Sequence, residues 1–307
     1  MTKIETAVYA LRAWLLRQQW FTSTVLPSIP RPARWLLRRL YFLPSDLIDR
    51  MLGHREEMFP PKSEIFTGSV DDFKRSGQAL VRRLVDLAGL TPDSTVLDVG
   101  AGMGRLAVAL TPYLKGGGCY EGMEIVPSGI KWCNDNITSR FPNFRFTLAD
   151  IYNKEYNPNG RIKATEYRFP YEDGTFDLVQ LTSVFTHMLP ADIEHYIAEI
   201  SRVLKEDGRC YVTYNLIDEE SLKSMEAGHS TLRLKHYVGP CWVVDAKVPE
   251  LAVGYDESYV RDLYERYALA SDYTIYYGSW SGRPLLPGKE PTYDQDIIVS
   301  ANPWGSA

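Results

Sequence analysis

The stretch VLDVGAGMGRLAVAL, residues 96–110, carries three glycines at alternate positions directly after a short apolar run. The β-branched and apolar residues before Gly100 predict a buried strand, and the apolar spacing after Gly104 predicts a helix. Glycine lets the chain turn sharply between the two elements, and it lets a ligand lie against backbone N–H groups at a helix N-terminus. This order of strand, glycine turn and helix predicts a nucleotide-type ligand at the end of the strand.

Helix and strand patterns alternate from residue 76 onward. Helices are expected at 76–90, 105–114, 127–141, 190–204 and 256–269, and strands at 94–100, 118–125, 144–150, 175–182, 208–216, 272–280 and 295–301. This alternation predicts an α/β fold: a doubly wound, mostly parallel seven-stranded sheet with helices on both faces. The carboxyl ends of the parallel strands, and the ligand with them, are then expected along one edge.

The charge of the chain is unevenly distributed. Its 39 acidic residues outnumber the 34 basic ones, which argues against a general nucleic-acid-binding protein. Residues 1–60 differ, because two basic amphipathic helices are expected there, with apolar faces at Ile4, Val8, Leu11 and Leu15 and at Leu36, Leu37 and Leu40. Three interpretations of this extension remain open: contact with an anionic membrane surface, packing on the main domain, or closure over the ligand pocket.

The main domain is expected to span residues 61–307, with an insertion of mixed character at 216–254. That insertion is interpreted either as a lid that shapes the substrate site or as a surface excursion that packs on the core. The four cysteines are scattered without a CxxC pair, which indicates a reducing compartment. No apolar run reaches the roughly 20 residues of a membrane span, and residues 1–20 are too charged for a secretion signal. A cytoplasmic location is therefore expected, and homo-oligomerisation is left open.

The acid before the glycines narrows the choice of ligand. Dinucleotide-binding turns have the spacing G-x-G-x-x-G, whereas here G-x-G-x-G follows Asp98. A carboxylate is unhelpful near a pyrophosphate and suits a ligand with an amino group or a cationic centre. At these residues the chain resembles the class I S-adenosylmethionine-dependent methyltransferase family, whose first motif is an acid followed by x-G-x-G-x-G. Asp98, Gly100, Gly102 and Gly104 match that motif without departure.

Two further acids end the next two predicted strands. Glu124 stands where a carboxylate can accept both ribose hydroxyls of a nucleoside. The resemblance implies that Ile125 lies beside the adenine and that Asp150 takes the adenine amino group, with Ile151 contributing its backbone N–H or packing. The alternative interpretation of these residues is that Glu124 is a surface acid and Asp150 a turn residue.

The resemblance is close over residues 76–215 and holds in outline over 256–301. The segment EISRVLKEDGRCYVT departs from the family pattern only at Asp207, which replaces a glycine in a turn. Thr182, at the end of the fourth strand, is expected near the methionine part of the cofactor. S-adenosylmethionine is thus the expected cofactor, and no metal-binding motif is present.

Transfer of a methyl group to a hydroxyl of high pKa needs a base. The best candidate is His187, which follows the fourth strand; its alternative role is to hydrogen-bond the backbone and shape the pocket. His229 and His236 in the insertion, and Trp280 and Arg283 in a glycine-rich loop, are candidate substrate residues, because an aromatic ring beside an arginine suits a sugar or an anion.

The function predicted from the sequence is methyl transfer to a small-molecule acceptor, with a hydroxyl of a sugar, glycolipid or natural product favoured. The alternatives are a nucleotide-dependent oxidoreductase and a non-catalytic protein that binds S-adenosylmethionine. The glycine spacing and Asp98 count against the oxidoreductase.

Overall fold

A computed structural model of the chain describes residues 31–53, 56–66, 72–154, 156–269, 273–283 and 294–302. The chain divides into two compact units, Met1–Ile65 and Phe66–Ala307. The helix expected around residues 4–16 lies outside the described residues. None of the described helices is long and apolar enough to cross a membrane.

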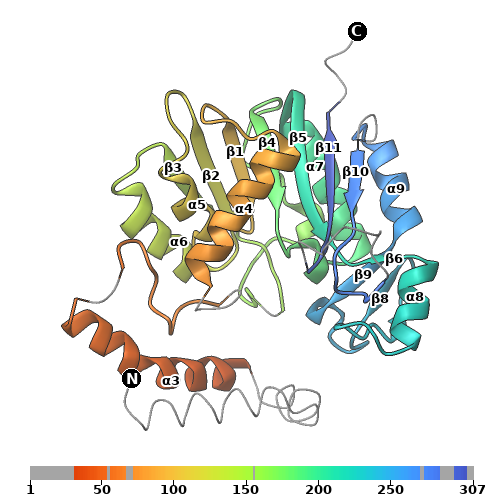
Figure 1. Ribbon diagram of the computed structural model, residues 1–307, viewed down its shortest axis with the longest axis horizontal. Helices are drawn as coiled ribbons and strands as arrows, with labels where there is room; N and C mark the ends of the chain where they lie inside the picture. Colours follow the sequence, from red (N-terminus) through yellow and green to blue (C-terminus); the bar gives the residue numbers. More distant parts are fainter. Residues whose placement is uncertain are drawn as a thin grey trace. The chain divides into compact units, whose positions relative to one another are not determined.

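The second unit is built on a seven-stranded sheet in the order β10-β11-β5-β4-β1-β2-β3 (Figure 1). The strands are β1 (Thr95–Val99), β2 (Cys119–Glu124), β3 (Phe144–Leu148), β4 (Phe176–Leu181), β5 (Leu204–Tyr214), β10 (Tyr273–Tyr276) and β11 (Asp296–Ala301). Strands β1 to β5 pair in parallel, and β11 is antiparallel to both of its neighbours. The expected α/β fold with a mostly parallel seven-stranded sheet is confirmed.

Helices cover both faces of this sheet. In Figure 1, α4 (Phe73–Ala88) crosses in front of the central strands and α7 (Pro190–Val203) lies behind them. The remaining helices of this layer structure are α5 (Arg105–Leu110), α6 (Pro127–Cys133) and α9 (Glu257–Arg266). Because both faces are covered, the central strands are apolar almost throughout, and Leu178 to Leu181 of β4 are all buried.

The insertion after β5 forms a small second sheet in the order β6-β9-β8-β7. Its elements are β6 (Leu216–Ile217), α8 (Glu219–Glu226), β7 (His236–Tyr237), β8 (Cys241–Val243), the 3₁₀ turn η5 (Pro249–Leu251) and β9 (Val253–Asp256). These strands are two to four residues long. Such short strands give too little alternation for the sequence to reveal them.

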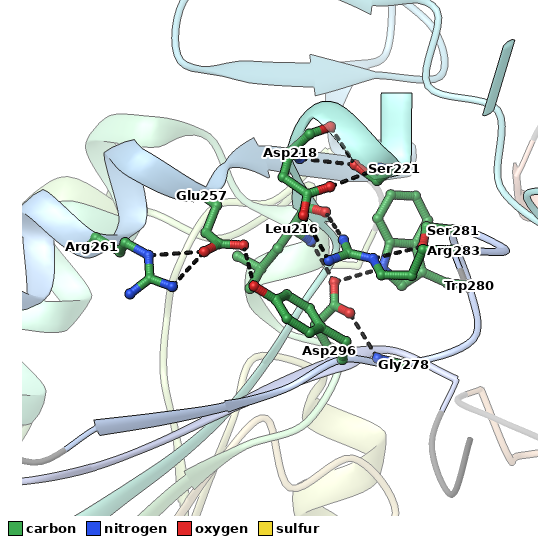
Figure 2. A network of polar contacts seen from close by, with 11 residues as sticks. Leu216, Asp218, Ser221, Glu257, Arg261, Gly278, Trp280, Ser281, Arg283 and Asp296 are labelled. Carbon is green, nitrogen blue, oxygen red and sulfur yellow. Dashed lines mark hydrogen bonds and ion pairs between the residues drawn. The ribbon is translucent and has the colours of Figure 1, made fainter. Parts of the chain in front are cut away.

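A buried carboxylate ties the insertion to the last strands of the main sheet (Figure 2). Asp296 begins β11, and its Oδ2 accepts the Leu216 N–H at 2.7 Å and the Trp280 indole N–H at 2.6 Å. Its Oδ1 accepts the Gly278 N–H at 2.8 Å. Burial raises the pKa of Asp296 to about 6, against the opposing effect of nearby Arg283 and of these donors.

Arg283 completes the same network from the loop after β10. Its guanidinium donates to the Asp218 carboxylate at 3.0 Å and to the Leu216 carbonyl at 2.9 Å. The guanidinium also lies over the Tyr277 ring, 4.2 Å from the ring centroid. The network therefore fixes the start of the insertion against the β10–β11 connection.

In the first unit, α3 (Arg31–Met51) contains the expected helical segment with Leu36, Leu37 and Leu40 and continues through Pro44. Its Asp46 carboxylate is buried and accepts the backbone N–H groups of Lys62 at 2.8 Å and Ser63 at 3.0 Å. The Lys62 ammonium also pairs with Asp49 at 2.9 Å. One side of α3 is thus held against the segment that follows it.

We expect Asp296→Asn to lower the free energy of unfolding by about 2 kcal/mol or more, because the amide group turns an NH₂ toward buried N–H donors. Urea denaturation measures this change. The control is Asp294→Asn, an exposed aspartate two residues earlier, which should shift stability by less than about 0.5 kcal/mol. Equal values for the two variants would show that the network does not stabilise the fold.

Candidate active site

A cavity of about 680 Å³ opens at the carboxyl ends of the parallel strands. The ends of β1, β2 and β4 and the segment after β3 form its walls, as expected where parallel strands end at one edge. The predicted site residues that line it are Asp98, Gly100, Glu124, Ile125, Ile151, Thr182 and His187. Residues predicted separately from the sequence are thus brought together in one cavity.

The glycine turn between β1 and α5 has a conformation that side chains oppose. Gly100, Gly102 and Gly104 have φ values of 84°, 58° and 70°. A Cβ on Gly100 would lie 2.5 Å from Cγ2 of Val184, and one on Gly104 would lie 2.7 Å from Cδ1 of Ile137. The turn therefore needs glycine both for its backbone angles and for the close approach of neighbouring side chains.

Asp98 is a buried acid on the cavity wall. Its carboxylate accepts a hydrogen bond from the Tyr120 hydroxyl at 2.5 Å and another from the Gln180 amide. The Thr182 hydroxyl in turn donates to the Gln180 carbonyl oxygen at 2.8 Å. Burial raises the pKa of Asp98 to about 7, although both of its donors act in the opposite direction.

Glu124 joins two turns of the cavity wall through its carboxylate. One oxygen accepts the Gly102 N–H at 2.7 Å, and the other accepts the N–H groups of Ile125 at 2.7 Å and Val126 at 2.9 Å. Burial raises the pKa of Glu124, while these three bonds oppose the rise. A carboxylate offers about four lone-pair sites, so one remains beside the Gly102 bond. A ligand can bind there without displacing a backbone group.

Ser183 follows β4 in an unusual conformation. Its φ is 59°, a left-handed value that is uncommon for a residue with a side chain. The Ser183 N–H donates to the Thr213 hydroxyl at 2.8 Å, and the Ser183 hydroxyl donates to the Gln295 side chain at 2.9 Å. Ser183 and Gln295 both line the cavity. The bonds to Thr213 and Gln295 therefore keep Ser183 in its strained backbone conformation at the cavity wall.

His187 lies in the 3₁₀ turn η4 (Phe185–His187) and faces the cavity. Its Nδ1 is 3.0 Å from the carbonyl oxygen of Glu250, which belongs to the insertion. A carbonyl oxygen only accepts, so this bond requires the proton on Nδ1 and leaves Nε2 unprotonated in the neutral ring. The arrangement prepares Nε2 to take a proton.

Comparison with known proteins adds to this geometry. Residues 97–212 match the model of a family described as a methyltransferase domain. This match confirms the resemblance to class I S-adenosylmethionine-dependent methyltransferases for this part of the chain. The match favours the methyltransferase interpretation over the oxidoreductase.

Two curated relatives are each similar to a little less than half of this chain. The methyltransferase GfsG of Streptomyces halstedii is 26% identical over 143 residues, 46% of this chain and 45% of that protein. The uncharacterized methyltransferase YcgJ of Bacillus subtilis (strain 168) is 24% identical over 146 residues, 48% of this chain and 50% of that protein. The chain therefore spans about half the length of the curated relatives it matches.

Among solved structures, the PH0226 protein of Pyrococcus horikoshii OT3 superposes with a TM-score of 0.51 at 16% identity. The superposition covers 78% of this chain and 93% of that chain, and it shows the shared fold.

S-adenosylmethionine is the cofactor of this methyltransferase domain, and the cavity fits it. The buried acids Asp98 and Glu124 suit a ligand with a cationic sulfonium and a charged amino group. Gly100 lines the cavity without a side chain, and a Cβ at this position would collide with Cγ2 of Val184. Among the described residues, no group of three or more His, Cys, Asp or Glu side chains is arranged to hold a metal ion.

Asp150 is directed away from the cavity, unlike its neighbours. Ala149 and Ile151 line the wall, whereas the Asp150 carboxylate forms an ion pair with Arg161. The Ile151 N–H is engaged by the Ala149 carbonyl at 2.8 Å, which leaves the Ile151 side chain as its contribution to the wall. The structure therefore does not support contact between the Asp150 carboxylate and an adenine in this cavity.

The four candidate substrate residues do not line the cavity either. His229 and His236 are exposed on the insertion. Trp280 and Arg283 are buried, and their polar groups are used by the network around Asp296 (Figure 2). The glycine-rich loop turns these two side chains toward the insertion instead of toward an acceptor.

The cavity also contains residues that the sequence did not single out. Arg105 of α5 lines it beside Asp98, and burial lowers the pKa of the Arg105 guanidinium. The segment 152–165 contributes further polar side chains, among them Asn153 and Tyr156. The only signal for this segment was the unusual length of the connection between the third and fourth strands, since long ordered loops are often functional.

We expect Glu124→Ala to lower the free energy of unfolding by about 3 kcal/mol, because it leaves three buried N–H groups without their acceptor. Urea denaturation without ligand measures the effect. The control is Glu121→Ala on the same strand, which removes a partly buried ion pair with the exposed Arg145 but leaves no backbone N–H group without its acceptor, and it should cost about 1 kcal/mol. Equal losses would argue that Glu124 does not hold the glycine turn.

Proposed function

We propose that this protein transfers a methyl group from S-adenosylmethionine to a hydroxyl oxygen of a small molecule, a sugar, glycolipid or other natural product. The observation that carries the proposal is the bond between His187 Nδ1 and the Glu250 carbonyl, which leaves Nε2 of this cavity-lining residue unprotonated in the neutral ring. A base beside the cofactor is what a hydroxyl acceptor requires, because its pKa lies far above neutral.

The cofactor supplies an electrophilic methyl group on a sulfonium sulfur. Asp98 is assigned to its amino group, because a buried carboxylate is stabilised by a cationic partner. The remaining lone pair of Glu124 is assigned to a ribose hydroxyl. Ile125 and Ile151 provide apolar walls for the adenine, while Thr182 is assigned to the methionine part.

His187 is assigned as the general base. As the acceptor oxygen attacks, Nε2 takes the hydroxyl proton, and Nδ1–H remains bonded to the Glu250 carbonyl. That carbonyl fixes the ring orientation and stabilises the imidazolium that results. Much of the remaining rate enhancement is expected from holding acceptor and methyl group in line.

The insertion and the N-terminal part have roles within the same proposal. Residues 216–254 are assigned as a lid on the acceptor side, a role that Glu250 supports because it lies on the cavity wall. Residues 1–60 are assigned as an extension that approaches an anionic membrane, where a lipid-linked acceptor would be found. A protein that binds S-adenosylmethionine without turnover is the remaining alternative.

We expect the affinity for S-adenosylhomocysteine to rise with pH and to level off above the Asp98 pKa of about 7. Below that pKa the carboxyl is protonated, so each further drop of one pH unit should lower the association constant by a factor that approaches about ten. Isothermal titration calorimetry one unit below and one unit above the pKa measures the change. Asp98→Asn should bind weakly with no such pH dependence. The same pH dependence in that variant would remove Asp98 from the amino-group site.

The catalytic assignment is tested with His187→Asn, whose side-chain amide can still donate to Glu250 but cannot act as a base. We expect turnover to fall by about 100- to 10,000-fold, with the affinity for S-adenosylhomocysteine nearly unchanged. A labelled-methyl assay on lipid extracts and oligosaccharide fractions, followed by mass spectrometry of the product, gives the readout.

The control is His195→Gln, because His195 bonds the Tyr167 carbonyl through Nε2 and does not line the cavity. Equal loss of turnover and cofactor affinity in His187→Asn would assign His187 a structural role. Ligand binding by the unchanged protein without any labelled product would favour the non-catalytic alternative.

A further inference from the structure

Helix α3 exposes an apolar face. The α3 face consists of Leu36, Leu37, Leu40, Leu43, Leu47 and Met51, whose side chains are between 43 and 84 % exposed. At the α-helical rotation per residue, they fall within an arc of about 120°. Exposed large apolar side chains are ordinary singly, but a continuous stripe of them indicates a binding surface.

The opposite side of α3 is the one held by its own unit. Phe42 and Asp46 are buried there, and Asp46 is fixed by two backbone N–H groups. The ion pair between Asp49 and Lys62 lies on the same side. Leu43 and Leu47 line a cavity together with Ser63 and Glu64, so the α3 face borders this segment along part of its length, yet its side chains stay at least 43 % exposed.

Positive charge borders the α3 face. Arg39 and Arg50 are exposed, and the helical rotation places both about 90° from the centre of the face, along one margin. The acids in α3 are Asp46 and Asp49. Asp46 accepts two backbone N–H groups, and Asp49 pairs with Lys62, so hydrogen-bonding partners already occupy both carboxylates. An apolar stripe with a cationic margin is complementary to a surface that is apolar inside and anionic outside.

We propose that the α3 face docks on an anionic lipid bilayer, with the leucines at the boundary of headgroups and acyl chains and Arg39 and Arg50 at the lipid phosphates. A second copy of the chain fits this surface less well. An antiparallel pair of copies would bring the same margins together, and the arginines would repel each other.

The benefit of docking rests on the proposed function, because a protein held at a bilayer meets lipid-linked acceptors. Docking itself requires no turnover. A failure to bind vesicles would therefore leave the methyl-transfer proposal standing, and a failure to transfer methyl groups would leave the docking surface standing.

The test is co-sedimentation of the full-length protein with phosphatidylcholine vesicles, with and without phosphatidylglycerol. We expect strong binding only when phosphatidylglycerol is present. Leu40→Glu combined with Leu47→Glu should lower the partition coefficient at least about tenfold, because two leucines that enter the bilayer are replaced by charged side chains. Arg39→Gln combined with Arg50→Gln should lower it about tenfold on the anionic vesicles alone.

The matched control is Arg82→Gln combined with Lys115→Gln, which removes two exposed positive charges from the second unit and should leave binding unchanged. Circular dichroism melting of each variant checks that the fold is kept. Equal binding by the leucine variant and the unchanged protein would overturn the proposal, as would the absence of binding to anionic vesicles. A solution dimer that the leucine variant dissociates, without vesicle binding, would assign the α3 face to self-association instead.

Discussion

The cavity depends on the bonds between the Glu124 carboxylate and three backbone N–H groups. These bonds connect the glycine turn after β1 to the turn that begins α6, so one side chain sets the spacing of two strand ends. The glycines allow the turn but do not hold it, since glycine has more backbone freedom than any other residue. A buried acceptor compensates for that freedom, and the cavity wall is formed before a ligand arrives.

The insertion is coupled to this wall at two places. Asp296 and Arg283 fix its first strand to the last strands of the main sheet, and the Glu250 carbonyl near its end orients His187. Gln295, the neighbour of Asp296, also accepts hydrogen bonds from Ser183 on the cavity wall and from Thr213 of β5. A displacement of the insertion would therefore remove or shift the carbonyl that orients the His187 ring.

The order and type of the main elements were predictable, because buried parallel strands and covering helices have strong periodicities. The convergence of Asp98, Glu124 and His187 followed from the rule that parallel strands end at one edge. Side-chain direction did not follow from the sequence. Asp150 and Ile151 alternate in direction, so the acid is turned outward. The bonds from Gln180 and Tyr120 to Asp98 were also invisible, since they join strands that are distant in sequence.

The electrostatics of the cavity explain how a glycine turn shared by many nucleotide-binding proteins discriminates between ligands. Asp98 and Glu124 are both buried, and burial raises the pKa of each because a charged carboxylate is poorly solvated there. A dinucleotide would bring its anionic pyrophosphate toward Asp98, and like charges at short distance in a partly desolvated site repel strongly. A ligand that placed a sulfonium or an amino group beside Asp98 would instead offset the desolvation cost of that carboxylate. Selectivity against pyrophosphate thus arises from repulsion as much as from attraction to the preferred ligand.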